Sequence, residues 1–250
     1  MTGAESGAAL QIKDVSKRHG DVEALAGVSL TVNAGECVAL VGESGSGKTT
    51  LLRCINRLHD PDTGTILIGG RDTRSVDAVE LRRSIGYVPQ DGGILPHWTV
   101  ARNVALVPVL CEMTDSAQRA TQALEAVGFD AATIGKRWPH ELSGGQRQRV
   151  AMARALAAGQ KLLLLDEPFG ALDAITRAEL QRQLRLIRER ERPTTVLVTH
   201  DLREAFFLAD RIAVLREGRI EQMADGATLR AQPATEYVQR LLAFADIGSQ

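Results

Sequence analysis

One stretch of this sequence carries the residue types that phosphate binding requires. Residues 42–49, Gly-Glu-Ser-Gly-Ser-Gly-Lys-Thr, fit the pattern G-x-x-x-x-G-K-[ST] and are called the P-loop below. Glycines let a backbone curl so that several N–H groups face one anion, and a following helix N-terminus adds partial positive charge. Lys48 would reach the β- and γ-phosphates of a nucleotide, and the Thr49 hydroxyl would bind Mg²⁺.

The neighbours of the P-loop match the strand–loop–helix context that this motif needs. Residues 37–41 are apolar and partly β-branched, which is typical of a buried strand, and residues 50–55 open a helix. The alternative is a Gly/Ser-rich loop that matches by chance, and this context argues against it. The predicted phosphate-binding residues are Gly42, Glu43, Ser44, Gly45, Ser46, Gly47, Lys48, Thr49 and Thr50.

Two acids follow a second apolar strand. Residues 162–165 are four leucines, and they end at Asp166 and Glu167. Asp166 is placed to hold Mg²⁺ through its water shell, and Glu167 to orient or deprotonate the water that attacks the γ-phosphate. The alternative is that the acids cap the next helix, and Pro168 directly after them weakens it.

A third motif, Leu-Ser-Gly-Gly-Gln at residues 142–146, precedes a helix that begins near Arg147. Taken alone, a serine and two glycines suit an anion-binding helix N-terminus or an ordinary serine N-cap. Together with the P-loop, this pentapeptide is the signature of the ATP-binding cassette (ABC) family. The sequence closely resembles the ATPase subunit of an ABC transporter nearly end to end, and the motifs come in the family's order.

The resemblance implies ATP and Mg²⁺ as cofactors and adds three site residues. Gln90 matches the glutamine that contacts Mg²⁺ and senses the transmembrane partner. His200, between Thr199 and Asp201, matches the switch histidine that holds the γ-phosphate; the alternative is a histidine that ends a strand and caps the next helix. Asp173 belongs to the D-loop, residues 170–173. The implied catalytic residues are Glu167, His200 and Gln90, and the implied metal ligands are Thr49, Gln90 and Asp166.

The resemblance also implies partners. Two ATPase subunits would pack head to tail as a homodimer, and each ATP would lie between the P-loop of one subunit and the signature of the other. A γ-phosphate that bridges two surfaces makes contacts that ADP lacks, so ATP favours closure and hydrolysis releases it. The expected further partners are transmembrane permease subunits and, indirectly, an extracytoplasmic solute-binding protein. The signature residues that would contact the partner's ATP are Ser143, Gly144, Gly145 and Gln146.

The sequence departs from the family pattern at two positions. His19 stands where the family usually has an aromatic residue, often tyrosine, that stacks on adenine. An imidazole can stack but offers less surface, so the adenine contact is expected to be weaker, unless His19 is simply a turn residue. Ala174 stands where many relatives carry proline, and little functional effect is expected there.

Within the family, residues 93–100 with Asn103, and residues 105–108 and 169–177, resemble importers of glycine betaine, choline or carnitine. Such proteins often carry regulatory CBS domains after the ATPase core; because the sequence ends at Gln250, none are expected here. By resemblance, a groove beside Gln90 receives a helix of the permease. Three apolar residues follow Gln90 and either line that groove or pack inside the helical lobe: Ile94, Leu95 and Trp98.

Other functions remain as alternatives. The solute could be a sulfonate, nitrate or methionine. ABC ATPases of DNA maintenance insert long coiled coils between P-loop and signature, whereas about ninety residues without sustained heptads separate the two motifs here. A binding module without catalysis is disfavoured by the joint presence of Lys48, Asp166, Glu167 and His200.

Composition agrees with a peripheral membrane subunit. Hydrophobic residues make up 44% and charged residues 24% of 250 residues, as in soluble globular proteins. With 30 basic and 31 acidic residues, the net charge of −1 gives no electrostatic case for nucleic acid as a partner. No signal peptide or run of ~20 apolar residues is present, so we expect a location at the cytoplasmic face of the membrane. Cys37, Cys54 and Cys111 are too scattered for a disulfide framework or a zinc site.

The expected fold class is α/β: a P-loop NTPase core of the ABC ATPase type, with an inserted α-helical subdomain and an N-terminal antiparallel β region. Residues 1–250 would form one ABC ATPase domain. Its core would cover about 8–90 and 159–225, its helical subdomain about 91–158 and its C-terminal helical tail about 226–250. Expected strands are 10–15, 25–32, 37–41, 65–68, 85–90, 162–165, 194–199, 211–215 and 219–223. Expected helices include 117–127, 146–158 and 177–192.

Overall fold

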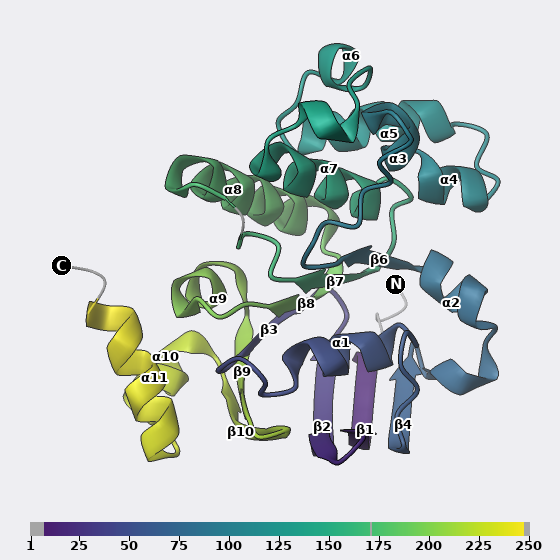
Figure 1. The fold of residues 1–250 in the computed structure, drawn as a ribbon. Coiled ribbons are helices and arrows are strands. Elements are labelled where there is room, and N and C mark those ends of the chain that lie inside the picture. Colours follow the sequence, from purple (N-terminus) through teal and green to yellow (C-terminus); the bar gives the residue numbers. More distant parts are fainter. Residues whose placement is uncertain (1–7, 171, 248–250) are drawn as a thin grey trace, which may run out of the picture. The chain divides into compact units, whose positions relative to one another are not determined.

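The computed structural model describes residues 8–170 and 172–247 (Figure 1). The described residues divide into two compact units. Those up to Leu81 and those from Thr194 onward form the first unit, and Arg82–Pro193 form the second. The second unit contains the predicted helical subdomain, residues 91–158, together with the strands and the helix that flank it. The predicted boundaries between core, subdomain and tail stay a prediction.

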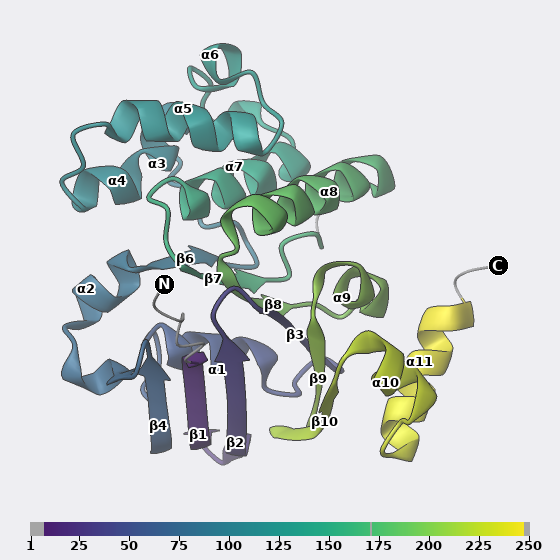
Figure 2. The ribbon, with the colours of Figure 1, turned by 180° about the vertical axis from the view of Figure 1, so that it is seen from behind.

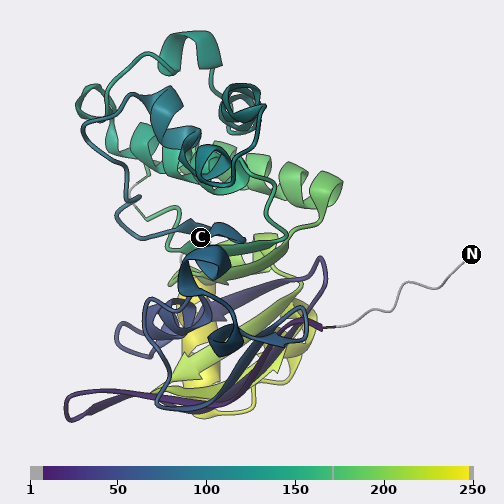
Figure 3. The ribbon, with the colours of Figure 1, turned by 90° about the vertical axis from the view of Figure 1, so that its right-hand side faces the viewer.

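The first unit begins with an antiparallel sheet. Its strands are β1 (Ala8–His19), β2 (Val22–Asn33), β4 (Thr63–Ile68) and β5 (Arg71–Asp72), in the order β2-β1-β4-β5. From Ala26 to Asn33, buried and exposed residues alternate along β2, as expected of a sheet with one solvated side. The β1–β2 hairpin, purple in Figure 3, confirms the predicted N-terminal β region. Both strands extend several residues beyond their predicted ends.

The first unit also holds a set of largely parallel strands. These are β3 (Cys37–Val41), β8 (Thr194–Val198), β9 (Arg211–Arg216) and β10 (Arg219–Ala224). β3 lies between β8 and β9 and is parallel to both, whereas β10 pairs antiparallel with β9. Every residue of β3 and β8 is buried, which explains their continuous apolar sequences. The P-loop follows β3 directly.

Helices flank these strands in the same unit (Figure 2). They are α1 (Lys48–Ile55), α9 (Leu202–Leu208), α10 (Gly226–Ala231) and α11 (Glu236–Ile247). The C-terminal helix α11 is anchored in the core, because its Tyr237 and Val238 pack in one cluster with residues of β3 and β9 such as Val41 and Val214. The short η1 (Thr73–Ser75) and α2 (Ala78–Arg83) lead from β5 toward the second unit.

The second unit is mainly helical. Its strands β6 (Ile85–Val88) and β7 (Leu162–Asp166) pair in parallel. Between them in sequence lie helices that gather around α7 (Figure 1), and α8 follows β7. The helices are α3 (Val100–Val104), α4 (Leu106–Leu110), α5 (Ser116–Ala126), α6 (Ala131–Ile134), η2 (Pro139–Glu141), α7 (Gly144–Leu156) and α8 (Ala174–Glu191).

Two of the element boundaries that differ from the prediction have a clear local cause. α8 begins at Ala174 rather than Arg177, because the Asp173 carboxylate caps it by accepting the N–H groups of Ile175 and Thr176. β6 ends at Val88, before Pro89, which has no N–H to continue a ladder. Within the described ranges, no helix is long and apolar enough to cross a membrane.

Candidate active site

The P-loop is held so closely by its neighbours that only glycine fits at two positions. A Cβ atom on Gly42 would lie 2.1 Å from the Leu215 carbonyl oxygen, and one on Gly47 would lie 2.4 Å from the Ala24 carbonyl oxygen. Both glycines also have positive φ angles, 149° and 103°, which disfavour side chains. The loop is therefore a narrow backbone cradle between β9 and β2, as a phosphate-binding function requires.

Lys48 points its charge into this cradle. The side chain is buried, and its ammonium group donates to the carbonyl oxygens of Gly42 at 2.8 Å and Glu43 at 2.7 Å and to the Ser46 hydroxyl at 3.2 Å. The N-cap of α1 is Gly47, so no side chain occupies the amino end of this helix. A cationic group and the N–H groups of a first helical turn thus lie in one loop, and this combination fits a polyphosphate. Thr49 and Thr50 lie half-buried in that first turn.

His19 is exposed as the last residue of β1, where the chain turns into β2. Its ring lies edge-on to the ring of His59, with 5.2 Å between the centroids and 70° between the planes. Burial and the nearby His19 both lower the pKa of His59. The position is compatible with a turn residue and with an adenine platform, so stacking on adenine stays a prediction.

His200 follows the buried strand β8 and is exposed. The helix after it, α9, is capped by the carboxylate of Asp201, which accepts the N–H of Arg203 at 2.8 Å. The alternative that His200 caps this helix is therefore wrong. Thr199 is buried, and its hydroxyl accepts the Asp201 N–H at 3.0 Å, which fixes the backbone on both sides of the histidine.

The second unit brings two predicted catalytic residues together. Glu167 is half-buried after β7, and its carboxylate oxygen Oε2 accepts a hydrogen bond from Gln90 Nε2 at 3.3 Å. Asp166, the last residue of β7, is buried. Glu167 has a φ of +48°, which is uncommon for a residue other than glycine and costs free energy. Because Asp173 caps α8, the alternative that the two acids cap the next helix is also wrong.

The signature residues form the amino end of α7. The Ser143 hydroxyl accepts the Gln146 N–H at 3.2 Å, and the Gln146 side chain accepts the Ser143 N–H at 3.1 Å. This capping box confirms the ordinary N-cap as the local structure. A hydroxyl that accepts one hydrogen bond still has an O–H to donate, so capping and phosphate contact are compatible. Ser143 and Gly144 are exposed, and a Cβ on Gly145 would lie 3.0 Å from the Leu172 side chain.

The D-loop residue Asp173 has a structural role in the same unit. The pKa of its carboxyl lies below the ordinary value, mainly because of a hydrogen bond from the Thr176 N–H and also because of one from the Thr176 hydroxyl. It therefore stays ionised at neutral pH and serves as a helix cap. Ala171 of the D-loop lies outside the described residues. The site residues thus fall into two groups: the P-loop, His19 and His200 belong to the first unit, and Gln90, the signature, Asp166, Glu167 and Asp173 belong to the second.

Asn103 has a structural role near the site that the sequence did not predict. Asn103 is fully buried, its side-chain oxygen accepts the Leu95 N–H at 2.8 Å, and its amide donates to the carbonyls of Leu95 and Trp98, both at 3.0 Å. It thereby fixes the loop that follows Gln90. In the sequence, Asn103 is only part of the family resemblance. A local pattern cannot predict that an asparagine in a short helix binds a backbone eight residues upstream.

Comparisons with known proteins agree with this arrangement. The family model described as "ABC transporter" matches residues 25–170, from β2 through the P-loop and signature to Gly170. The chain belongs to the ABC transporter family. Among solved structures, it is similar to the dimeric post-hydrolysis state of the ATP-binding cassette MJ0796 bound to ADP and Pi. That match has a TM-score of 0.80 and 34% identity, and covers 86% of this chain and 98% of the other. The predicted fold class is therefore confirmed.

Curated relatives share most of this ABC chain. It is 46% identical over 226 residues to the osmoprotectant import ATP-binding protein OsmV of Salmonella typhimurium, covering 90% of this chain and 59% of OsmV. It is 43% identical over 236 residues to the choline transport ATP-binding protein OpuBA of Bacillus subtilis, covering 93% and 62%. It is 47% identical over 236 residues to the sulfate/thiosulfate import ATP-binding protein CysA of Mycobacterium bovis, covering 94% and 66%. The chain thus spans about 60% of the length of OsmV and OpuBA.

Proposed function

We propose that this chain hydrolyses ATP to energise an ABC importer. The observation that carries the proposal is the pair formed by Glu167 and Gln90 beside the buried Asp166. A carboxylate held by a neutral amide keeps its ability to accept a proton from water, and an acid next to it supplies a ligand for Mg²⁺. Phosphate release by the purified chain with MgATP, and its absence with AMP or without Mg²⁺, is the direct test.

Each group of the site has a role in this proposal. The P-loop and Lys48 hold the phosphates, and His200 contacts the γ-phosphate. Thr49, Gln90 and Asp166 offer a hydroxyl, an amide and a carboxylate, which are the oxygen donors that suit Mg²⁺. The ion would supply charge neutralisation on the phosphates. Glu167 orients the attacking water or takes its proton.

The working unit in this proposal is a head-to-tail dimer of two copies. The exposed Ser143 and Gly144 at the amino end of α7 would contact ATP on the P-loop of the other copy. The dimer would act at the cytoplasmic face of a membrane, on permease subunits that receive solute from an extracytoplasmic binding protein. The names of the relatives OsmV and OpuBA, and the dimeric state of MJ0796, support this assembly.

A quaternary-amine osmoprotectant such as glycine betaine, choline or carnitine is the proposed solute. Support comes from relatives named for osmoprotectant and choline import. The sulfate/thiosulfate relative, at 47% identity, favours an inorganic anion as the second candidate. Because the ATPase does not touch the solute, uptake by cells that carry the whole gene cluster must decide. Accumulation of labelled glycine betaine or choline is expected, and sulfate uptake without it would favour the second candidate.

The loop after Gln90 is the proposed contact with the permease. Leu95 is 38% exposed, and Trp98 is half-buried with the Arg102 guanidinium 4.2 Å from its ring centre. We expect Trp98→Ala to reduce solute uptake strongly while the ATPase activity of the isolated subunit stays within about twofold. Trp138→Ala is the matched control, because Trp138 is 42% exposed at η2 and should leave uptake unchanged. Full uptake in the Trp98 variant would contradict the assignment.

His19 is proposed to stack on adenine. Because an imidazole covers less of the base than a phenol ring, we expect His19→Tyr to keep or tighten ATP binding and His19→Ala to weaken it about three- to tenfold. Calorimetric titration with a non-hydrolysable ATP analogue measures both effects. His59→Ala is the control for indirect effects through the neighbouring ring. An unchanged affinity in His19→Ala would make His19 a turn residue only.

A further inference from the structure

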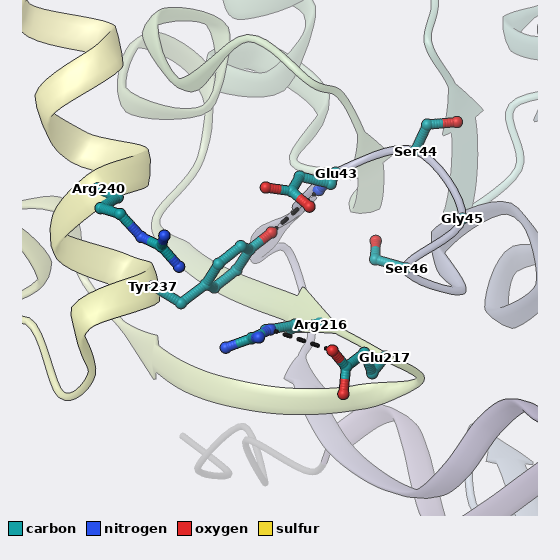
Figure 4. Close-up of a pocket in the computed structure, with 8 residues that line it drawn as sticks. All are labelled: Glu43, Ser44, Gly45, Ser46, Arg216, Glu217, Tyr237 and Arg240. Atoms are coloured by element: carbon teal, nitrogen blue, oxygen red, sulfur yellow. Dashed lines mark hydrogen bonds and ion pairs between the residues drawn. The ribbon is translucent and has the colours of Figure 1, made fainter.

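Residues 43–46 of the P-loop lie beside the C-terminal helix α11. Figure 4 shows a pocket of the first unit in which P-loop residues meet the β9–β10 turn and α11. Its lining residues are Glu43, Ser44, Gly45, Ser46, Arg216, Glu217, Tyr237 and Arg240. The Tyr237 hydroxyl joins the helix to the loop, because it accepts the N–H of Glu43 at 3.1 Å (Figure 4). The helix therefore contacts the P-loop backbone itself.

The tyrosine ring is itself fixed. Tyr237 is 4% exposed and packs in the core cluster that includes Val41 and Val214. The Arg216 guanidinium lies 5.0 Å from the centre of its ring, within the range of a cation–π contact. With the ring held by the core and by Arg216, the hydroxyl has a defined position, so it can act as a fixed anchor for the loop.

The anchor acts on the residue that Lys48 also uses. The N–H of Glu43 donates to Tyr237, and the carbonyl oxygen of Glu43 accepts from the Lys48 ammonium at 2.7 Å. The same carbonyl accepts the N–H of Ser46 at 3.2 Å. Tyr237 thus helps to fix the backbone of Glu43, to which both Lys48 and Ser46 hydrogen-bond.

We propose that Tyr237 is a positioning residue for nucleotide binding: its hydroxyl holds the P-loop in the shape that receives the phosphates of ATP. This inference rests on the proposed role of the P-loop as the phosphate site. A loop held in its binding shape loses less conformational freedom when the ligand arrives, so affinity rises without a direct contact. The Tyr237 hydroxyl should stabilise bound ATP and the transition state equally, because both keep their phosphates in the loop. KM should therefore respond and kcat should not.

Tyr237→Phe isolates the hydroxyl, because it keeps the ring, its packing and the contact with Arg216. The expected result is a rise of about three- to tenfold in Kd for the β,γ-imido analogue of ATP, since the Glu43 N–H loses its partner and the loop its anchor. KM for ATP should rise by the same factor, with kcat within about twofold of wild type. Isothermal titration and steady-state phosphate release with the full chain measure these values.

Val238→Ala is the matched control. Val238 is the next residue of α11 and is fully buried in the same cluster, but its apolar side chain cannot hydrogen-bond to the P-loop. Its truncation should lower the melting temperature more than Tyr237→Phe does, because it leaves a cavity, and should leave Kd unchanged. An unchanged Kd in Tyr237→Phe, or an equal rise in both variants, would overturn the inference and make Tyr237 a core residue only.

A Lys48→Ala variant separates this inference from the function on which it rests. Loss of analogue binding in Lys48→Ala supports the P-loop as the phosphate site. If Lys48→Ala loses binding while Tyr237→Phe binds like wild type, the positioning role fails and the site assignment stands. If Lys48→Ala itself binds the analogue like wild type, the P-loop is not the nucleotide site and both proposals fail.

Discussion

Glu167→Gln is expected to reduce ATP turnover by about 100-fold or more while ATP binding persists. The amide cannot take a proton from the attacking water, whereas the carboxylate can. Other properties of the position are preserved. The new side chain has nearly the same size, it keeps an oxygen that can accept from Gln90 Nε2, and glutamine and glutamate tolerate the φ of +48° at this residue equally poorly. The change therefore tests chemistry rather than folding.

The same variant is expected to accumulate in an ATP-bound dimer, because hydrolysis no longer removes the γ-phosphate that favours closure. Phosphate release measures turnover, titration with ATP measures binding, and size-exclusion chromatography with MgATP measures dimer formation. Glu189→Gln is the control: it removes a carboxylate that is 59% exposed on α8 and pairs with Arg185. It should match wild type in all three assays. Near-normal hydrolysis by Glu167→Gln would mean that another group acts on the water.

The elements that carry the site could be predicted because their sequences are dominated by local constraints. The five buried residues of β3 and the four leucines of β7 read as strands that are covered on both faces. Neighbouring backbone atoms leave no room for a Cβ in the P-loop: one on Gly42 would lie 2.1 Å from the Leu215 carbonyl oxygen. The loop geometry therefore requires glycine at fixed positions, and the sequence shows this as a motif. The helices α3, α4 and α6 have five or fewer residues, which is less than two helical turns. The apolar pattern therefore cannot repeat within them, and the sequence does not predict them individually.

Contacts between distant residues were not predictable from local patterns. Gln90 and Glu167 lie 77 positions apart, and Glu43 and Tyr237 lie 194 apart. Family resemblance marked the first pair as catalytic but said nothing of a hydrogen bond between them. For the second pair there was no signal, since one tyrosine in a helical tail reads as an ordinary core residue. Such pairings depend on how strands and helices pack, and propensity and periodicity do not encode that.

Lys48→Ala and Ser143→Arg are each expected to abolish most ATP hydrolysis alone and to restore part of it when mixed. The first removes the cation held in the P-loop, and the second places a bulky charged side chain at the exposed amino end of α7. In a head-to-tail dimer each site takes its P-loop from one chain and its signature from the other. A mixed dimer therefore has one intact site and one site with both defects.

Equal mixing gives about half mixed dimers with one working site each, so activity should recover to about a quarter of wild type if the sites act independently. Phosphate release before and after mixing measures this recovery. The double variant with both changes in one chain is the control. Mixed with wild type, it forms dimers in which both sites carry one defect, and these should add no activity. A mixture of the single variants that is no more active than either alone would contradict the composite site.

Disulfide crosslinking makes the same distinction by geometry. In a variant with both Ser44→Cys and Ser143→Cys, a disulfide should link two chains in the presence of ATP, since the P-loop of one copy would face the signature of the other. Native thiols interfere little: Cys37 is buried, and burial raises the pKa of the Cys54 thiol to about 11, so Cys111→Ser removes the more accessible one. A crosslink within one chain, with no covalent dimer, would place Ser143 beside its own P-loop. The head-to-tail arrangement would then be wrong, because it requires the two groups to meet only between copies.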